Sequence, residues 1–194
     1  MEFIENHLST TSKIIQLLDH NKIKKLIDSL VELREKNGRL FVLGVGGSAA
    51  NASHAVNDFR KLANLETYAP TDNVSELTAR TNDEGWETVF SKWLEVSRLN
   101  STDGLLIFSV GGGSIEKQIS VNLCNAIDLA LERGTKIFGI VGREDSYTAK
   151  HADCCIVVPI VDPEMVTPHS EAIQSVIWHL MVSHPALKNN PTKW

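Results

Sequence analysis

Apolar residues follow two different patterns along the chain, which separate predicted helices from predicted strands. From Phe3 to Lys36 they recur about every 3.6 residues, as expected of amphipathic helices that bury one face. A polar interruption at 19–21 divides this region into two predicted helices, and Asn37-Gly38 supplies a left-handed stop. The helical segment must bury its apolar stripe either on its own sheet or on another subunit.

After residue 38 the apolar residues gather into short, nearly continuous runs separated by helical patterns. Such runs are typical of buried strands in a parallel sheet with helices on both faces. The sequence therefore predicts an α/β fold, a three-layer sandwich with a five-stranded parallel sheet, preceded by N-terminal helices. We expect a single domain over 1–194, with 1–37 as the N-terminal helical segment and 38–194 as the α/β core. The predicted strands cover 39–43, 67–69, 104–110, 136–141 and 154–159.

Two predicted strands end in glycine-rich turns, Gly44-Val-Gly-Gly-Ser48 and Ser109-Val-Gly-Gly-Gly-Ser114. A helix is expected to start at the serine of each turn, and the second helix to end at Gly134. Free backbone N–H groups at a helix N-terminus suit an anion, most often a phosphate. One such turn could equally serve close helix–strand packing, whereas two at neighbouring strand ends favour a phosphorylated ligand. Neither matches a nucleotide-binding motif, so no nucleotide cofactor is expected.

Four ionisable residues on two predicted helices are candidates for chemistry. His54 and Asp58 share one helix face, as an ordinary surface pair or, behind a phosphate turn, as a metal-binding or proton-transferring pair. Glu171 and His179 lie on the last predicted helix, 167–183, and could equally be a solvated acid and a core histidine. They lie about 12 Å apart along the helix axis. We therefore expect a second subunit to be needed for these residues to meet the first pair.

Composition and charge narrow the possible partners. A formal net charge of −5 argues against non-specific nucleic-acid binding, and an anion must be held by local geometry rather than by a positive field. No apolar run approaches membrane-spanning length, and the acidic N-terminus lacks a signal-peptide pattern. We expect a cytoplasmic protein with no membrane partner. The three cysteines, Cys124, Cys154 and Cys155, are few and irregularly placed, and the neighbouring Cys154 and Cys155 are expected to be buried, reduced thiols.

A set of motifs spans nearly the whole chain: Gly44–Ser48 with His54 and Asp58, Asn82-Asp83-Glu-Gly85, Ser109–Ser114, Thr167-Pro-His-Ser-Glu171 and Val176-Ile-Trp-His179. Together these motifs resemble the sugar isomerase (SIS) superfamily and, within it, the phosphoheptose isomerases. The resemblance implies a homotetramer with active sites between subunits. It also implies conversion of sedoheptulose 7-phosphate to D-glycero-D-manno-heptose 7-phosphate through an enediol.

The resemblance further implies roles for individual residues. In the family members that bind zinc, the metal ligands would correspond to His54, Asp58, Glu171 and His179. Asp58 would be the catalytic base, with Glu171 as the alternative, and His179 would move protons on the sugar oxygens. The implied substrate-binding residues are Gly46, Gly47, Ser48, Asn82, Asp83, Ser109, Gly111, Ser114 and Glu171.

Departures from the family pattern leave the substrate open. Val45 stands where the family usually has asparagine, and the second turn has glycines in place of a hydroxyl pair. Asp58 replaces the family's glutamate and Glu171 its glutamine, an exchange that could keep a metal site, mark a different sugar or mark lost activity. The alternatives are an isomerase for a different sugar phosphate and a non-catalytic phosphosugar-sensing or protein-binding SIS regulator. Positions 54, 58, 171 and 179 all carry ionisable or metal-binding side chains, which favours an enzyme over a non-catalytic protein.

Overall fold

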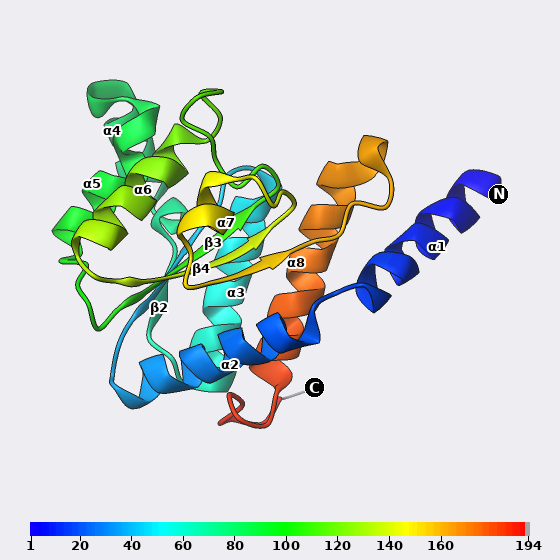
Figure 1. Ribbon diagram of the computed structural model, residues 1–194. Coiled ribbons are helices and arrows are strands. Elements are labelled where there is room, and N and C mark those ends of the chain that lie inside the picture. Colours follow the sequence, from blue (N-terminus) through cyan, green and yellow to red (C-terminus); the bar gives the residue numbers. More distant parts are fainter. Residues whose placement is uncertain (193–194) are drawn as a thin grey trace.

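The computed structural model describes residues 1–192 and shows a parallel sheet between two layers of helices (Figure 1). The strands are β1 (Leu40–Leu43), β2 (Thr67–Tyr68), β3 (Gly104–Ser109), β4 (Lys136–Val141) and β5 (Cys154–Val157). They lie in the order β2-β1-β3-β4-β5, and every neighbouring pair is parallel. The five strands predicted from the sequence are confirmed to within two residues at each end.

The α-helices precede and connect these strands. They are α1 (Glu2–Gln16), α2 (His20–Glu35), α3 (Gly47–Ala63), α4 (Val74–Glu84), α5 (Val89–Val96), α6 (Val121–Glu132), α7 (Tyr147–His151) and α8 (Val166–Ser183). The predicted break before α2 is confirmed, because the Asp19 carboxylate caps that helix by accepting from two backbone N–H groups. Asn37 adopts the left-handed conformation (φ 54°) that ends it. Of the helices within residues 1–192, none is long and apolar enough to cross a membrane.

Strand side chains alternate between two hydrophobic cores. Leu40 and Val42 of β1 pack in one core with buried residues of α2, α3 and α8. Phe41 and Leu43 pack in the other, with α5 and α6. Because successive side chains of a strand point to opposite faces, apolar residues at every position require helices on both faces. The predicted three-layer α/β sandwich is thereby confirmed.

The strand order brings the two glycine turns to neighbouring strand ends. β1 and β3 are paired from Leu40↔Gly104 to Leu43↔Ile107, so their carboxyl ends meet at one edge of the sheet. The chain leaves β1 for β2 on one side, and continues from β3 to β4 on the other. Open α/β sheets bind ligands where their connections diverge in this way. The crevice beyond β1 and β3 is therefore the expected ligand site.

The helix after the second turn begins later than predicted. α6 starts at Val121 rather than Ser114, and the residues between form a loop closed by a bridge between Ser114 and Ile119. Positive φ angles at Gly112 (65°) and Ser120 (46°) interrupt any continuous helix. Ser114 is consequently not at a helix N-terminus, and the helix-dipole argument for an anion applies to the first turn alone.

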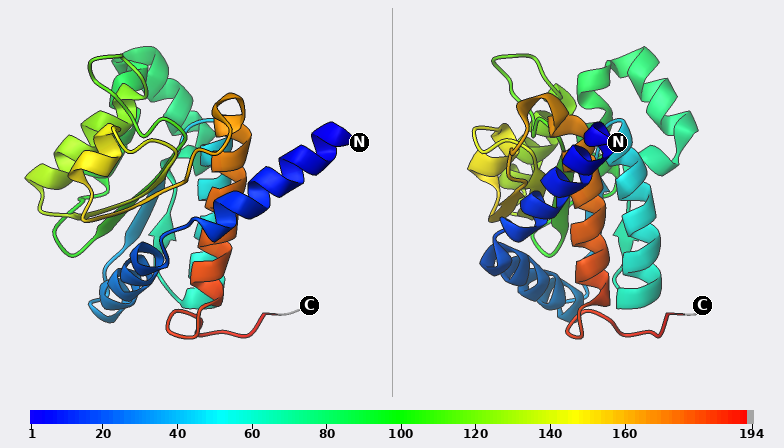
Figure 2. Two further views of the ribbon diagram at one scale, coloured as in Figure 1. Left: turned by 45° about the vertical axis from the view of Figure 1, so that its right-hand side comes forward. Right: turned by 90° about the vertical axis from the view of Figure 1, so that its right-hand side faces the viewer.

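Helix α1 projects from the rest of the chain (Figure 2). Ile14 near its end is buried, whereas Phe3, Ile4 and Leu8 are 54–69% exposed. The ring of His7 stacks on that of His169 in α8, with centroids 4.5 Å apart. The end of the apolar stripe of α1 therefore joins the core at Ile14, while the rest of the stripe is exposed in this chain, and its burial on another subunit stays a prediction.

We expect the three cysteines to resist thiol reagents in the folded protein. All three are buried and reduced, as predicted for Cys154 and Cys155, and burial raises the pKa of each thiol, that of Cys155 to about 12. Since the thiolate is the reactive form, little of it exists at mildly alkaline pH. Ellman's reagent should detect no thiol in the native protein and all three after unfolding in guanidinium chloride. Fast native reaction of any cysteine would contradict the burial.

Candidate functional site

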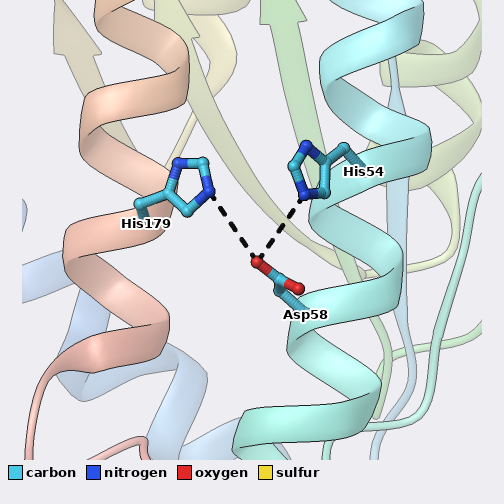
Figure 3. A group of neighbouring side chains, drawn as sticks. All are labelled: His54, Asp58 and His179. Carbon is cyan, nitrogen blue, oxygen red and sulfur yellow. Dashed lines mark ion pairs between the residues drawn. The ribbon is translucent and has the colours of Figure 1, made fainter. Parts of the chain in front are cut away.

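Three of the four candidate residues meet between helices α3 and α8 (Figure 3). His54 and Asp58 project from α3, and His179 projects from α8. Oδ2 of Asp58 lies 4.0 Å from Nε2 of His54 and 3.9 Å from Nε2 of His179. One potential ligand atom from each residue lies within 4.8 Å of the others. We call these three residues the His/Asp cluster.

The prediction that the His54/Asp58 pair needs a second subunit to meet His179 is wrong, because the His/Asp cluster forms within one chain. α3 and α8 pack side by side and run in the same direction (Figure 1), and His179 lies across from the His54/Asp58 pair (Figure 3). The length of α8 separates only Glu171 from the cluster. The roughly 12 Å between Glu171 and His179 along α8 does not determine how far His179 lies from a neighbouring helix.

Neighbouring groups orient the cluster. Nδ1 of His179 donates to the backbone carbonyl of Ser175 at 2.8 Å, which orients the ring so that Nε2 faces Asp58. The second carboxylate oxygen of Asp58 accepts from the Asn57 amide at 2.8 Å. The sequence interpretation did not identify Ser175, although a residue four positions before a histidine on a helix is a usual partner. The side chain of Asp58 is 14% exposed and that of His179 46%, so the cluster opens to solvent.

The donor set of the cluster fits a zinc ion. Two imidazole nitrogens and one carboxylate oxygen, with a fourth position open, match the ligation of catalytic zinc. The hydrogen bond that fixes the His179 tautomer is the kind of outer support that zinc-binding histidines have. The donor atoms are close enough for small side-chain rotations to bring them onto one ion.

Glu171 lies at the first glycine turn and not at the cluster. Its carboxylate occupies the space that a Cβ at Gly47 would need, so a larger residue at Gly47 would displace the Glu171 side chain. The Asn51 amide donates to the Glu171 backbone carbonyl at 2.9 Å and ties α8 to α3. A carboxylate at the N-terminus of α3 is favourably placed in the helix dipole. Glu171 as a fourth metal ligand stays a prediction, and it would require a cluster from another subunit.

Ser48 is engaged in the contact between α3 and α8. Its side chain is buried, and its hydroxyl donates to Oε1 of Gln174 at 3.1 Å. The Asn51 amide donates to the same oxygen at 3.1 Å. The sequence interpretation missed Gln174, since nothing local to either helix signals that a buried amide of α8 faces the serine.

Ser48→Ala is expected to lower the free energy of unfolding by about 1 kcal/mol, the net value of one hydrogen bond. The loss should be no greater, because Oε1 of Gln174 keeps its bond from Asn51. Urea denaturation measures it, with Ser75→Ala, at an exposed serine of α4, as the matched change. Equal stability of wild type and Ser48→Ala would contradict a structural role for this hydroxyl.

The other predicted substrate residues lie in different places. Gly46 and Gly47 are exposed at the first turn. Ser109 is buried, and its Oγ accepts from the Gly112 N–H at 2.9 Å, which shapes the second turn. Asn82 and Asp83 lie exposed on α4, where the amide of one donates to the carboxylate of the other at 2.7 Å. Gly111 and Ser114 line a pocket at the second turn. The phosphate and sugar roles of these residues stay predictions.

Comparisons with known proteins agree with the resemblance seen in the sequence. The family described as "SIS domain" matches residues 2–142. The chain is 31% identical over 188 residues to the lincomycin biosynthesis protein LmbN of Streptomyces lincolnensis, covering 93% of this chain and 68% of LmbN. It is 30% identical over 171 residues to a phosphoheptose isomerase of Pelobacter propionicus, covering 84% and 86%.

A solved structure shares the fold. The phosphoheptose isomerase GmhA from Neisseria gonorrhoeae superposes with a TM-score of 0.81 at 24% identity, over 93% of this chain and 96% of that one. The five-stranded parallel sheet and its flanking helices are thus an arrangement that the family uses. The chain belongs to the SIS domain family, in the group that includes the phosphoheptose isomerases.

Proposed function

We propose that the protein is an aldose–ketose isomerase of sugar phosphates. Sedoheptulose 7-phosphate is the preferred substrate and D-glycero-D-manno-heptose 7-phosphate the product. The observation that carries the proposal is the His/Asp cluster, which puts a carboxylate and two imidazoles together in a chain related to phosphoheptose isomerases. The relation to LmbN is the reason to test other sugar phosphates as well.

The chemistry needs a base and a proton carrier. Asp58 removes the proton on the carbon next to the carbonyl, and the substrate becomes an enediol. His179, whose Nε2 lies 3.9 Å from that carboxylate, transfers a proton between the two substrate oxygens. Return of the first proton to the neighbouring carbon completes the exchange of aldose and ketose. Nothing is oxidised or reduced overall, so the reaction needs no nucleotide cofactor.

Zinc is the proposed metal. His54, Asp58 and His179 would hold it, with Glu171 of another subunit as the predicted fourth ligand. When bound, the ion supplies Lewis-acid polarisation of a carbonyl oxygen. Glu171 also remains the alternative to Asp58 as the base, since its carboxylate lies against Gly47 of the first glycine turn.

We place the complete active site between subunits of a homotetramer. Asp58 lies eleven positions after Gly47, about 16 Å along α3, so one small ligand cannot contact both the first turn and the cluster of the same chain. A second subunit can bring its own turn to the cluster. The exposed apolar residues of α1, and the exposure of His54 and His179, are consistent with a partner on this side.

The test is direct conversion of sugar phosphates. Purified protein is stripped of metal, reloaded with zinc and incubated with sedoheptulose 7-phosphate, and the sugars are followed by NMR. Hexose and pentose phosphates form the comparison panel. Zinc-dependent interconversion supports the proposal. Binding of sugar phosphates without interconversion of any of them contradicts it and favours the non-catalytic SIS regulator.

A further inference from the structure

A tryptophan of α8 contacts both histidines of the His/Asp cluster. The indole of Trp178 stacks on the imidazole of His179, with ring centroids 3.4 Å apart. It meets the imidazole of His54 edge to face, with centroids 4.6 Å apart and an angle of 63° between the ring planes. Stacked and edge-to-face arrangements are the ones that aromatic pairs prefer. One side chain therefore contacts two imidazoles that come from different helices.

The core of the protein fixes Trp178 itself. It is the largest fully buried side chain within residues 1–192, and it packs in the core to which α2, α3 and α8 contribute. Successive residues of a helix are about 100° apart around its axis, so Trp178 points into the core while His179 lies at the edge of the buried face. Because close packing leaves a core side chain one position, the indole is a fixed surface for the rings beside it.

The two imidazoles have few other supports. The side chains of His54 and His179 are 59% and 46% exposed, so each ring is partly open to solvent. His179 donates from Nδ1 to the Ser175 carbonyl, whereas the His54 ring forms no hydrogen bond within residues 1–192. Exposed side chains change rotamer readily unless a contact prevents it. The orientation of His54 therefore depends most on its contact with Trp178.

The indole nitrogen indicates that Trp178 does more than fill space. Its Nε1–H group is buried and has no hydrogen-bond partner among residues 1–192. A buried donor without a partner destabilises the folded protein, and an apolar side chain at this position would avoid that loss. What the indole supplies is a flat surface wide enough for two imidazoles, which an aliphatic side chain lacks.

We propose that Trp178 is a positioning residue, which holds the imidazoles of His54 and His179 so that both Nε2 atoms face Asp58. These atoms lie 4.0 and 3.9 Å from Oδ2 of Asp58, in the arrangement that Figure 3 shows. Ligands that are already oriented lose less conformational freedom when an ion binds, so the zinc affinity rises. The effect on zinc rests on the proposed function, whereas the effect on the orientation of the rings does not.

Zinc affinity is the first readout, measured by competition with a chromophoric chelator at one fixed pH. Trp178→Leu is expected to lower it about 10–100-fold, the range for losing a group that orients a zinc ligand. Trp178→Phe should lose less, because phenylalanine keeps an aromatic surface. Trp93→Leu is the matched control, since this half-buried tryptophan packs in the other core, beside Phe41. It should unfold at lower urea concentration than wild type but keep the zinc affinity of wild type.

Nitrogen-15 NMR of the imidazoles in the metal-free protein is the second readout, at mildly alkaline pH, where neutral imidazole is the main form. His54→Ala and His179→Ala assign the two signals, and each ring should show one tautomer in wild type. In Trp178→Phe the His54 signals should average between tautomers. Those of His179 should change less, because Ser175 still accepts from that ring. Trp93→Phe should leave both rings as in wild type.

The positioning role is overturned if Trp178→Leu, or Trp178→Phe where the leucine variant does not fold, keeps both the zinc affinity and the imidazole signals of wild type. An equal loss of zinc affinity in Trp93→Leu overturns it as well. Imidazole order that depends on Trp178 in a protein that binds no zinc would instead refute the proposed metal and leave the positioning role standing.

Discussion

Asp58→Asn is expected to lower kcat for sugar-phosphate isomerisation by about 10²–10⁴-fold, the contribution of a positioned general base. The amide keeps the shape of the side chain and its contact with Asn57, but it cannot accept a proton from carbon. Rates are measured by NMR, and uptake of deuterium from the solvent at the reacting carbon gives an independent readout of proton removal.

Asp28→Asn is the matched control for this change, because Asp28 is an exposed acid of α2 paired with Lys24, on a different helix from the cluster. Zinc content is measured in every variant, so that a lost base can be told apart from a lost ligand. Full activity of Asp58→Asn would remove Asp58 as the base. If Glu171→Gln then loses the deuterium exchange, Glu171 takes that role.

His179→Ala is expected to lower zinc affinity by about a hundredfold or more. Loss of a group that merely orients a zinc ligand costs 10–100-fold, and His179 is itself one of the three donors of the cluster. The measurement is competition with a chromophoric chelator at one fixed pH, because imidazole binds metal only when deprotonated. Zinc should also raise the Tm of wild type more than that of the variant.

His20→Ala is the corresponding control, since His20 is an exposed histidine at the start of α2, remote from the cluster in sequence and in no predicted site. Its zinc affinity should equal that of wild type. Equal affinity in wild type, His179→Ala and His20→Ala would show that the cluster is a surface arrangement of polar side chains and not a metal site.

The fold was largely predictable because its signals are local. The apolar run at 104–109 has buried side chains at every position, and this pattern alone required helices on both faces of the sheet. Asp19 marked the start of a helix through its capping carboxylate, and Asn37 marked the end through its left-handed backbone conformation. The start of α6 was not predictable in this way. Glycines permit either a helix start or a loop, and the bridge between Ser114 and Ile119 formed the loop.

The site was predictable in its residue types and less so in its geometry. The spacing of His54 and Asp58 placed them on one face of a helix, because that follows from helical geometry. Whether His179 would join them depended on how α8 packs against α3. The spacing of residues within α8 gives no information about that packing. The role of Ser48 depended likewise on Gln174, a side chain of a distant element that lies opposite it.

The sequence by itself determined the layers of the fold, the two glycine turns and the ionisable residues from which a site could be built. These are properties of short segments, set by side-chain period and backbone freedom. Only the tertiary structure decided that the His/Asp cluster is complete in one chain, that Glu171 lies at the first turn, and that Trp178 lies against His54. Those juxtapositions arise from helix packing and strand order, which join residues far apart along the chain and therefore leave no local pattern.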